Sequence, residues 1–121
     1  MPAELGMFSL SLAVQDLDAS LEFYEALGFE VADGGHQSEG YPDTDEYRWR
    51  LLANGDTRIG LFEGMFERNM LTFNPPDVPA LLDQLEEAGV APARSTDDDE
   101  EHGTYAVLHD PDGNPVLLDQ P

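Results

Sequence analysis

Side chains able to do acid–base or metal chemistry are few in this sequence and widely spaced. His36 and His102 lie in acidic stretches where we expect exposed loops, and no histidines are spaced as paired metal ligands. His109 precedes an Asp-Pro turn and is expected to help fix it. Glu63 could act as a base, but a solvated strand end is its more ordinary role. These residues predict no catalytic constellation.

Serines near the N-terminus are candidates for contact with a ligand. Ser9 and Ser11 alternate with apolar residues, so they share the second face of a predicted strand. No histidine lies near them in the sequence, and no Gly-x-Ser-x-Gly elbow marks an activated serine. We therefore expect small hydrogen-bonding side chains that line an enclosed space.

A local positive charge surrounds the single tryptophan. Arg48 and Arg50 flank Trp49 in a chain whose formal net charge is -21. Arginines in such a setting can hold a carboxylate or a phosphate of a ligand. The alternative, which the sequence favours slightly, is pairing with neighbouring acids such as Asp45 and Glu46.

Aromatic, sulfur-containing and small residues gather in the segment 57–73, TRIGLFEGMFERNMLTF. Methionine adapts to irregular pockets and aromatic faces suit planar or apolar ligands, so this segment is a candidate pocket lining. An ordinary core or a dimer interface would have the same composition. The residues concerned are Gly60, Phe62, Met65, Phe66, Met70 and Thr72, and the strand phase of Tyr105 and Val107 allows them to face the same space.

The elements that must position these candidates follow from periodicity. Residues 7–14 alternate as a strand, Asp16 or Asp18 can cap the helix that comes next, and Gly28 can end it. The sequence Asn54-Gly55-Asp56 is typical of a hairpin turn. Further strands are predicted over 29–32, 47–53, 57–63, 69–74, 90–94, 104–109 and 115–119, with an acidic loop over 95–103.

The order of these elements, βαβββ, occurs twice. When the second half of the sequence is overlaid on the first, Asp77 falls on Asp16 and Gly89 falls on Gly28, so a second capped helix is expected. A slightly smaller offset places Leu118 on Leu61. We predict an α+β fold with an internal duplication, in one domain that spans residues 1–121. Its modules cover about 7–63 and 69–119.

Composition limits the class of protein and its partners. Asp and Glu total 26, and their mutual repulsion is screened in concentrated salt, so we expect a halophilic protein, with an ordinary acidic protein as the alternative. This charge disfavours nucleic acid and anionic membranes as partners. The sequence has no long apolar run, no signal-like N-terminus and no cysteine, so a soluble, cytoplasmic protein is expected.

The sequence resembles the vicinal oxygen chelate superfamily in the segments LAVQDLDASLEFYEALGFEV and LHDPDGNPVLLDQ. This superfamily includes glyoxalase I, extradiol dioxygenases, fosfomycin-resistance enzymes and bleomycin-resistance proteins. The resemblance covers essentially the whole chain. It implies two βαβββ modules whose curved mixed sheet surrounds a cleft, often completed in a homodimer. It does not imply one reaction, because the fold hosts several.

The resemblance also implies where a divalent metal would be bound. The superfamily usually takes one His, Glu or Gln from the first and last strand of each module. The matching positions of this sequence hold Ser9, Gly60, Met70 and Leu117, none of which suits Mn, Fe, Ni or Zn. We therefore expect no metal and no cofactor.

The first functional hypothesis is a metal-free protein that binds a small molecule, similar to bleomycin-resistance proteins, with no catalytic residue assigned. One alternative is a glyoxalase-like lyase or dioxygenase with an atypical metal site. Another is a structural or regulatory dimer without a specific ligand. The residues expected to line the cleft are Ser9, Trp49, Arg50, Phe62, Met70, Thr72, Tyr105 and Leu117.

Overall fold

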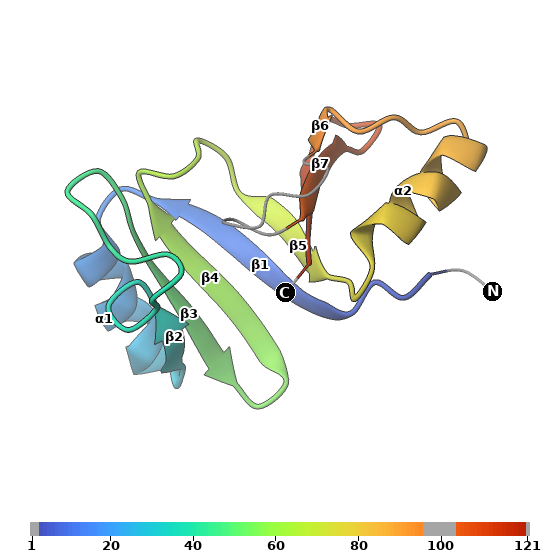
Figure 1. Cartoon of the computed structure of the whole chain (residues 1–121). Helices are drawn as coiled ribbons and strands as arrows, with labels where there is room; N and C mark the ends of the chain where they lie inside the picture. The colour runs from blue at the N-terminus through green and yellow to red at the C-terminus, as the bar shows by residue number, and fades with distance from the viewer. Residues whose placement is uncertain (1–2, 96–103, 121) are drawn as a thin grey trace. The chain divides into compact units, whose positions relative to one another are not determined.

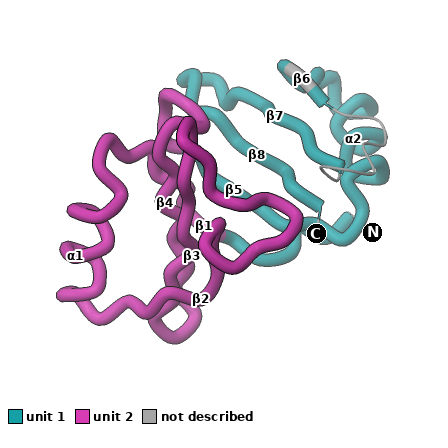
Figure 2. Tube along the Cα trace, turned by 60° about the vertical axis from the view of Figure 1, so that its left-hand side comes forward, with its two compact units in different colours: residues 1–8, 70–121 teal, residues 9–69 magenta. Residues whose placement is uncertain are grey.

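The computed structural model describes residues 3–95 and 104–120 of the chain. Its helices and strands are labelled in Figure 1. The chain forms two compact units (Figure 2), which are described one at a time. Unit 2 is Ser9–Asn69, and unit 1 combines the described residues of Met1–Phe8 with those of Met70–Pro121.

Unit 2 is a four-stranded mixed sheet with one helix packed against it. Its strands are ordered β2-β3-β4-β1, and only the β1–β4 pair is parallel. Its core consists of Leu17, Leu52, Ile59 and Leu61, because alternate residues of the strands face the helix. The elements are β1 (Met7–Val14, entering unit 2 at Ser9), α1 (Leu17–Leu27), β2 (Glu30–Gly34), β3 (Arg48–Asn54) and β4 (Thr57–Glu63).

Specific bonds fix both ends of α1. The carboxylate of Asp16 accepts the backbone N–H of Ala19 at 3.1 Å, so Asp16 is the N-cap. The carboxylate of Glu63 accepts the N–H of Leu17 at 2.9 Å and thereby joins the helix to the end of β4. At the other end, Gly28 has a φ of 112°, which favours glycine, and the predicted helix stop is confirmed.

Unit 1 repeats this arrangement around α2. Its strands are ordered β5-β8-β7-β6, with a parallel β5–β8 pair. The core contains Val78, Leu81, Ala106 and Leu118. Asp77 caps the helix through the N–H of Ala80 at 3.0 Å, as predicted. The elements are β5 (Met70–Asn74), α2 (Val78–Glu87), β6 (Arg94–Ser95), β7 (Tyr105–His109) and β8 (Pro115–Asp119).

The N-terminal segment, up to the first residues of β1, packs within unit 1. Ala3 contacts the core of this unit, and its N–H donates to the side chain of Gln84 at 2.8 Å. The ring of Phe8 lies 5.3 Å from that of Phe73. Between these contacts, Gly6 has a φ of 72°, and a Cβ there would collide with the carbonyl of Asn74. A glycine is therefore required where the segment passes the end of β5.

Strand register shows the internal duplication directly. In unit 2, Ser11 of β1 pairs with Gly60 of β4, and in unit 1, Thr72 of β5 pairs with Leu117 of β8. These two pairs coincide when the units are overlaid by the two offsets that the sequence indicates. The α+β fold class with βαβββ modules and mixed sheets is confirmed.

Strand boundaries differ from the predictions at a few places. The strand predicted over 90–94 is wrong in position, because Pro92 offers no N–H and pairing begins only at Arg94. The strand predicted over 29–32 begins and ends later, as Glu30–Gly34. Residues 96–103 of the predicted acidic loop lie outside the described residues. Neither of the described helices is long and apolar enough to cross a membrane.

Candidate functional site

A stacked pair of aromatic rings lies on the face of unit 2 that is turned away from α1. Trp49 of β3 and Phe62 of β4 are cross-strand partners, whereas Leu52 and Leu61 of the same two strands point to the opposite, helix-covered face. The ring centroids are 6.2 Å apart and the planes differ by 7°. Phe66 packs on Phe62 at 5.1 Å. We call Trp49, Phe62 and Phe66 the aromatic platform.

A glycine beneath the platform makes room for it. A Cβ on Gly60 would be 2.4 Å from Cε2 of Phe62 and 3.2 Å from Cδ2 of Leu51, so the Phe62 ring lies over the Gly60 backbone. Ser11 is the β1 partner of Gly60 and is buried, whereas Ser9, which precedes it on the same face of β1, is half-buried. The structure therefore places the predicted residues Ser9, Trp49 and Phe62 on one face of unit 2.

The loop between β2 and β3 holds the tryptophan in place. The indole N–H of Trp49 donates to the carbonyl of Tyr41 at 2.7 Å, and its backbone N–H donates to the carboxylate of Asp43 at 3.2 Å. The rings of Tyr41 and Tyr47 pack together at 5.7 Å. Trp49 is thus held in place by hydrogen bonds as well as by stacking.

Arg50 lies on the opposite face from Trp49, because successive strand residues alternate. It is 9% exposed. Its guanidinium donates to both oxygens of Asp43 at 3.1 and 2.9 Å and to the carbonyl of Trp49 at 2.6 Å. The pairing alternative is observed, with Asp43 rather than Asp45 or Glu46 as the partner. Arg50 therefore anchors the loop to β3, and its predicted ligand contact stays a prediction.

Arg48 makes a second, more exposed ion pair. Its guanidinium donates to the carboxylate of Asp18 on α1 at 3.1 and 3.4 Å. The hydrogen bond with Arg48 lowers the pKa of the Asp18 carboxyl from its usual value. Both arginines that flank Trp49 are thus engaged with acids of unit 2.

The remaining predicted residues share one face of unit 1, turned away from α2. Met70 and Thr72 alternate on β5 with Phe73, which packs on the core, and both are nearly buried. Leu117 of β8 is the partner of Thr72. Tyr105 is half-buried and lies on the same face of β7, since Val107 of that strand pairs with Leu117. Tyr105 therefore shares a face with Leu117, and its contact with a ligand stays a prediction.

Asp119 is an ionisable residue on this face that the sequence analysis missed. It is the partner of Tyr105 across the β7–β8 pair and is half-buried. Burial raises the pKa of its carboxyl above the usual value. No described side chain donates a hydrogen bond to that carboxyl; the Asn74 amide donates instead to the backbone carbonyl of Asp119, at 2.9 Å. The signal that could have found it is its place in the second repeat, where it overlays on Phe62 of the first.

The other candidate ionisable groups have structural surroundings. His36 and His109 are exposed, and His102 lies outside the described residues. The turn after His109 is fixed by the carboxylate of Asp110, which accepts the N–H groups of Asp112 and Asn114 at 2.9 and 2.8 Å. The Asn114 side chain lowers the pKa of the Asp110 carboxyl. Because these bonds come from Asp110, the turn-fixing role expected of His109 is wrong.

The donor set at the four positions that would hold a metal does not fit a divalent ion. Ser9 offers a hydroxyl, Met70 a nearly buried thioether and Leu117 only hydrocarbon. Gly60 has no side chain, and the ring of Phe62 fills the space that a ligand there would need. In residues 3–95 and 104–120, no three His, Cys, Asp or Glu side chains are grouped to hold a metal ion.

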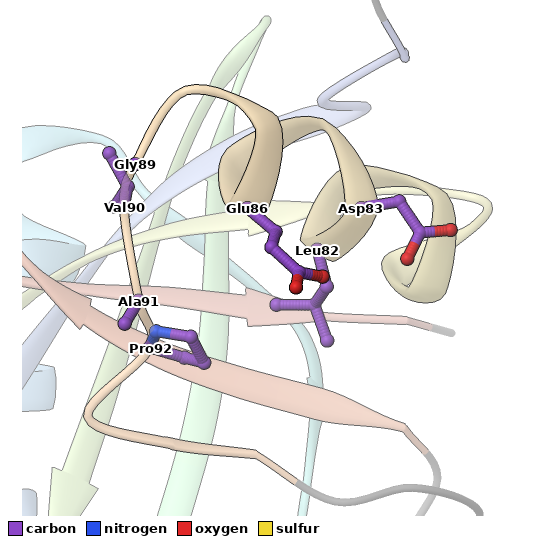
Figure 3. Close-up of a pocket in the computed structure, with 7 residues that line it drawn as sticks. All are labelled: Leu82, Asp83, Glu86, Gly89, Val90, Ala91 and Pro92. Atoms are coloured by element: carbon purple, nitrogen blue, oxygen red, sulfur yellow. The ribbon is translucent and has the colours of Figure 1, made fainter.

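A separate pocket of about 380 Å³ lies between α2 and the segment that follows it (Figure 3). Leu82, Val90 and Pro92 give it apolar walls. The Asp83 side chain points away from the other residues that line the pocket. None of the residues predicted to bind a ligand lines this pocket, and both of its carboxylates belong to exposed residues. It is not part of the candidate site.

Comparison with known proteins identifies the family. A family model described as Glyoxalase/Bleomycin resistance protein/Dioxygenase superfamily matches residues 6–118. A comparison with curated protein sequences finds no significant match.

Several solved structures have a similar fold at low sequence identity. Methylmalonyl-CoA epimerase from Mycobacterium tuberculosis is 19% identical, with a TM-score of 0.65 over 97% of this chain and 87% of that one. A hypothetical protein from Bacillus halodurans C-125 is 14% identical, with a TM-score of 0.69 over 100% and 96%. A glyoxalase/bleomycin resistance protein/dioxygenase superfamily member from Vibrio splendidus 12B01 is 18% identical, with a TM-score of 0.61 over 94% and 97%. At these identities, the similarity shows the fold alone.

Proposed function

Since the chain belongs to the glyoxalase/bleomycin resistance protein/dioxygenase superfamily, we propose that it binds a small molecule whose planar, apolar part stacks on the aromatic platform of unit 2. The observation that supports this most strongly is the near-parallel stack of Trp49 and Phe62 on the face turned away from α1. Planar ligands gain from offset stacking on such rings, by about 0.5–1.5 kcal/mol per pair beyond burial of area.

The platform is already ordered before any ligand arrives. The Trp49 indole is hydrogen-bonded to Tyr41, the Phe62 ring lies over Gly60, and Phe66 packs against Phe62. Binding then requires little ordering of side chains, a term that otherwise costs about 0.5–1.5 kcal/mol for each flexible side chain. Ser9 supplies a hydroxyl of the same unit as a candidate hydrogen-bonding group.

The residues at the positions where this superfamily takes its metal ligands favour ligand binding over metal-dependent catalysis. Gly60 and Leu117 cannot coordinate an ion, and Ser9 and Met70 are poor ligands for the metals of this superfamily. Nothing in this proposal requires a cofactor. A homodimer and a cytoplasmic location remain predictions from the resemblance and the composition.

A thermal-shift screen in 1 M KCl tests the proposal. Quinoline and 2-naphthoate are the planar probes, and cyclohexanecarboxylate is the non-planar control. We expect a planar probe to raise the melting temperature of the wild type and to lose that effect in Phe62→Leu. Phe23→Leu is the matched control, because Phe23 is an exposed aromatic of the same unit outside the platform. Equal shifts in wild type and Phe62→Leu would overturn the proposal.

Metal analysis of protein purified in high salt without chelator is the second test. We expect less than a stoichiometric amount of any transition metal. A stoichiometric metal that survives dialysis would contradict the proposal and favour an enzyme with an atypical metal site.

A further inference from the structure

The duplicated units carry different chemistry at equivalent positions. In unit 2 the cross-strand pair is Trp49 and Phe62, and in unit 1 the corresponding antiparallel pair is Tyr105 and Asp119. The strand register shows that Phe62 and Asp119 are equivalent. Phe62 lies two residues after Gly60, the partner of Ser11, and Asp119 lies two residues after Leu117, the partner of Thr72. A stacked apolar pair is thus replaced by a phenol beside a carboxylate.

The main chain around Asp119 is held firmly. The Asn74 amide donates to its carbonyl at 2.9 Å, and the N–H of Gln120 donates to the carbonyl of Thr104 at 2.9 Å. The side chain of Gln120 accepts the N–H of Val78 at the start of α2, at 2.7 Å. The backbone at Asp119 is therefore fixed, and no described side chain donates to its carboxylate.

A half-buried carboxylate to which no described side chain donates lowers the stability of the fold. Desolvation is the cause of its raised pKa, with no contribution from a charged partner. An apolar residue, as Phe62 is in unit 2, would avoid this cost. Groups retained at a cost in stability and with perturbed ionisation are characteristic of binding and catalytic sites.

We propose that Asp119, with Tyr105 beside it, binds the protonated nitrogen of a small organic amine on the face of unit 1 turned away from α2. An ammonium supplies the hydrogen bonds and the positive charge that the carboxylate lacks. Tyr105 gives an aromatic ring next to the acceptor, and aromatic faces attract cations. This site lies within unit 1, so the proposal goes beyond the function proposed for the platform.

Among the described residues, few other titratable groups surround Asp119. On β7, the same face carries Tyr105 and, further along the strand, His109. The neighbouring β5 residues on that face, Met70, Thr72 and Asn74, are uncharged, as is Leu117 of β8 itself. The ionisation of Asp119 is therefore expected to control amine binding between acidic and neutral pH.

NMR of 13C-labelled protein tests the proposal at the site itself. Benzylammonium chloride is added in 1 M KCl, where the Debye length is about 3 Å and general attraction to an acidic surface is screened. We expect shifts of the Asp119 carboxyl and Tyr105 ring signals, a lower apparent pKa of Asp119 and tighter binding as pH rises through that pKa. Benzyl alcohol, the neutral analogue, should leave the pKa of Asp119 unchanged.

Two variants distinguish binding at Asp119 from general attraction of the cation to the protein's negative charge. Asp119→Asn should weaken benzylammonium binding by about tenfold, as expected for a lost charge-assisted hydrogen bond. Asp112→Asn removes one carboxylate from an exposed turn of the same unit and should change nothing. Equal affinity of wild type and Asp119→Asn, or equal loss in both variants, would overturn the proposal. Because Trp49 takes no part in this readout, failure here is distinguishable from failure of the platform proposal.

Discussion

The ring of Phe62 lies over Gly60, so closely that a Cβ at residue 60 would be 2.4 Å from Cε2 of that ring. Gly60 is also where the superfamily resemblance implies a metal ligand on the last strand of the first module. The absence of a side chain at this position is therefore what allows an aromatic ring to lie on the face of unit 2 turned away from α1. Gly60 thus both lacks a metal ligand and leaves room for the Phe62 ring, which is part of the candidate surface for planar ligands.

Gly60→Ala tests this relationship. The added methyl group must displace the Phe62 ring, and we expect a loss of about 1–3 kcal/mol in the free energy of unfolding by urea, typical of overpacking. The emission of Trp49 should change as well, because its stacking partner moves. Gly40→Ala is the control, since a Cβ there meets nothing within 4 Å. An unchanged Trp49 spectrum in Gly60→Ala would refute the described packing.

Arg50→Ala tests the anchoring of the loop. The substitution leaves the half-buried carboxylate of Asp43 without its main donor, so we expect a loss of about 1.5–3 kcal/mol of unfolding free energy. Arg48→Ala should cost less, because the Asp18 side chain of that pair is 75% exposed. A double-mutant cycle with Asp43→Asn measures the coupling. A coupling energy near zero would show that the pair does not hold the loop.

The pH dependence of stability tests the environment of Asp119. Its pKa is raised in the folded state, so the folded protein holds this proton more tightly than the unfolded chain does. Below the unfolded pKa, this carboxyl makes no destabilising contribution. The contribution grows as pH rises from the unfolded pKa to the folded pKa, and it is complete above the folded pKa. Asp119→Asn should be more stable than wild type at pH 7, and the difference should shrink toward pH 4. A difference that grows on acidification would contradict the raised pKa.

Salt dependence tests the expected adaptation to concentrated salt. With a formal net charge of -21, repulsion among carboxylates opposes the compact state at low ionic strength. Screening lengths fall from about 10 Å at 0.1 M salt to about 3 Å at 1 M. We expect the melting temperature to rise markedly from low to molar KCl. A melting temperature that does not respond to KCl would refute this expectation.

Most of the fold could be predicted because its signals are local. Three of these signals lie within a few residues: the alternation in β1, the cap at Asp16 and the glycine after α1. The fourth, the repeat offset, is visible by comparing the two halves of the sequence. The position of β6 could not be predicted, since Pro92 weakens the local signal and the strand depends on pairing with β7.

The sequence predicted which candidate residues share a face of the sheet, but it did not predict the residues with which they interact. The shared face of Met70, Thr72, Tyr105 and Leu117 follows from period-two alternation and register. The pairing of Arg50 with Asp43 depends instead on how the long loop folds back, which no local pattern specifies. Asp119 was missed for a related reason, because its burial results from tertiary packing rather than from its neighbours in sequence.

The central claim, that planar ligands stack on Trp49 and Phe62, is tested most directly by tryptophan fluorescence. Trp49 is the single tryptophan of the chain, so its emission reports on this site alone. Titration of wild type, Phe62→Leu and Phe23→Leu with quinoline in 1 M KCl should give saturable quenching. We predict that Phe62→Leu weakens binding about two- to tenfold, as loss of one stacking contact implies, while Phe23→Leu matches wild type. Absence of saturable quenching, or the same affinity in all three proteins, would contradict the claim.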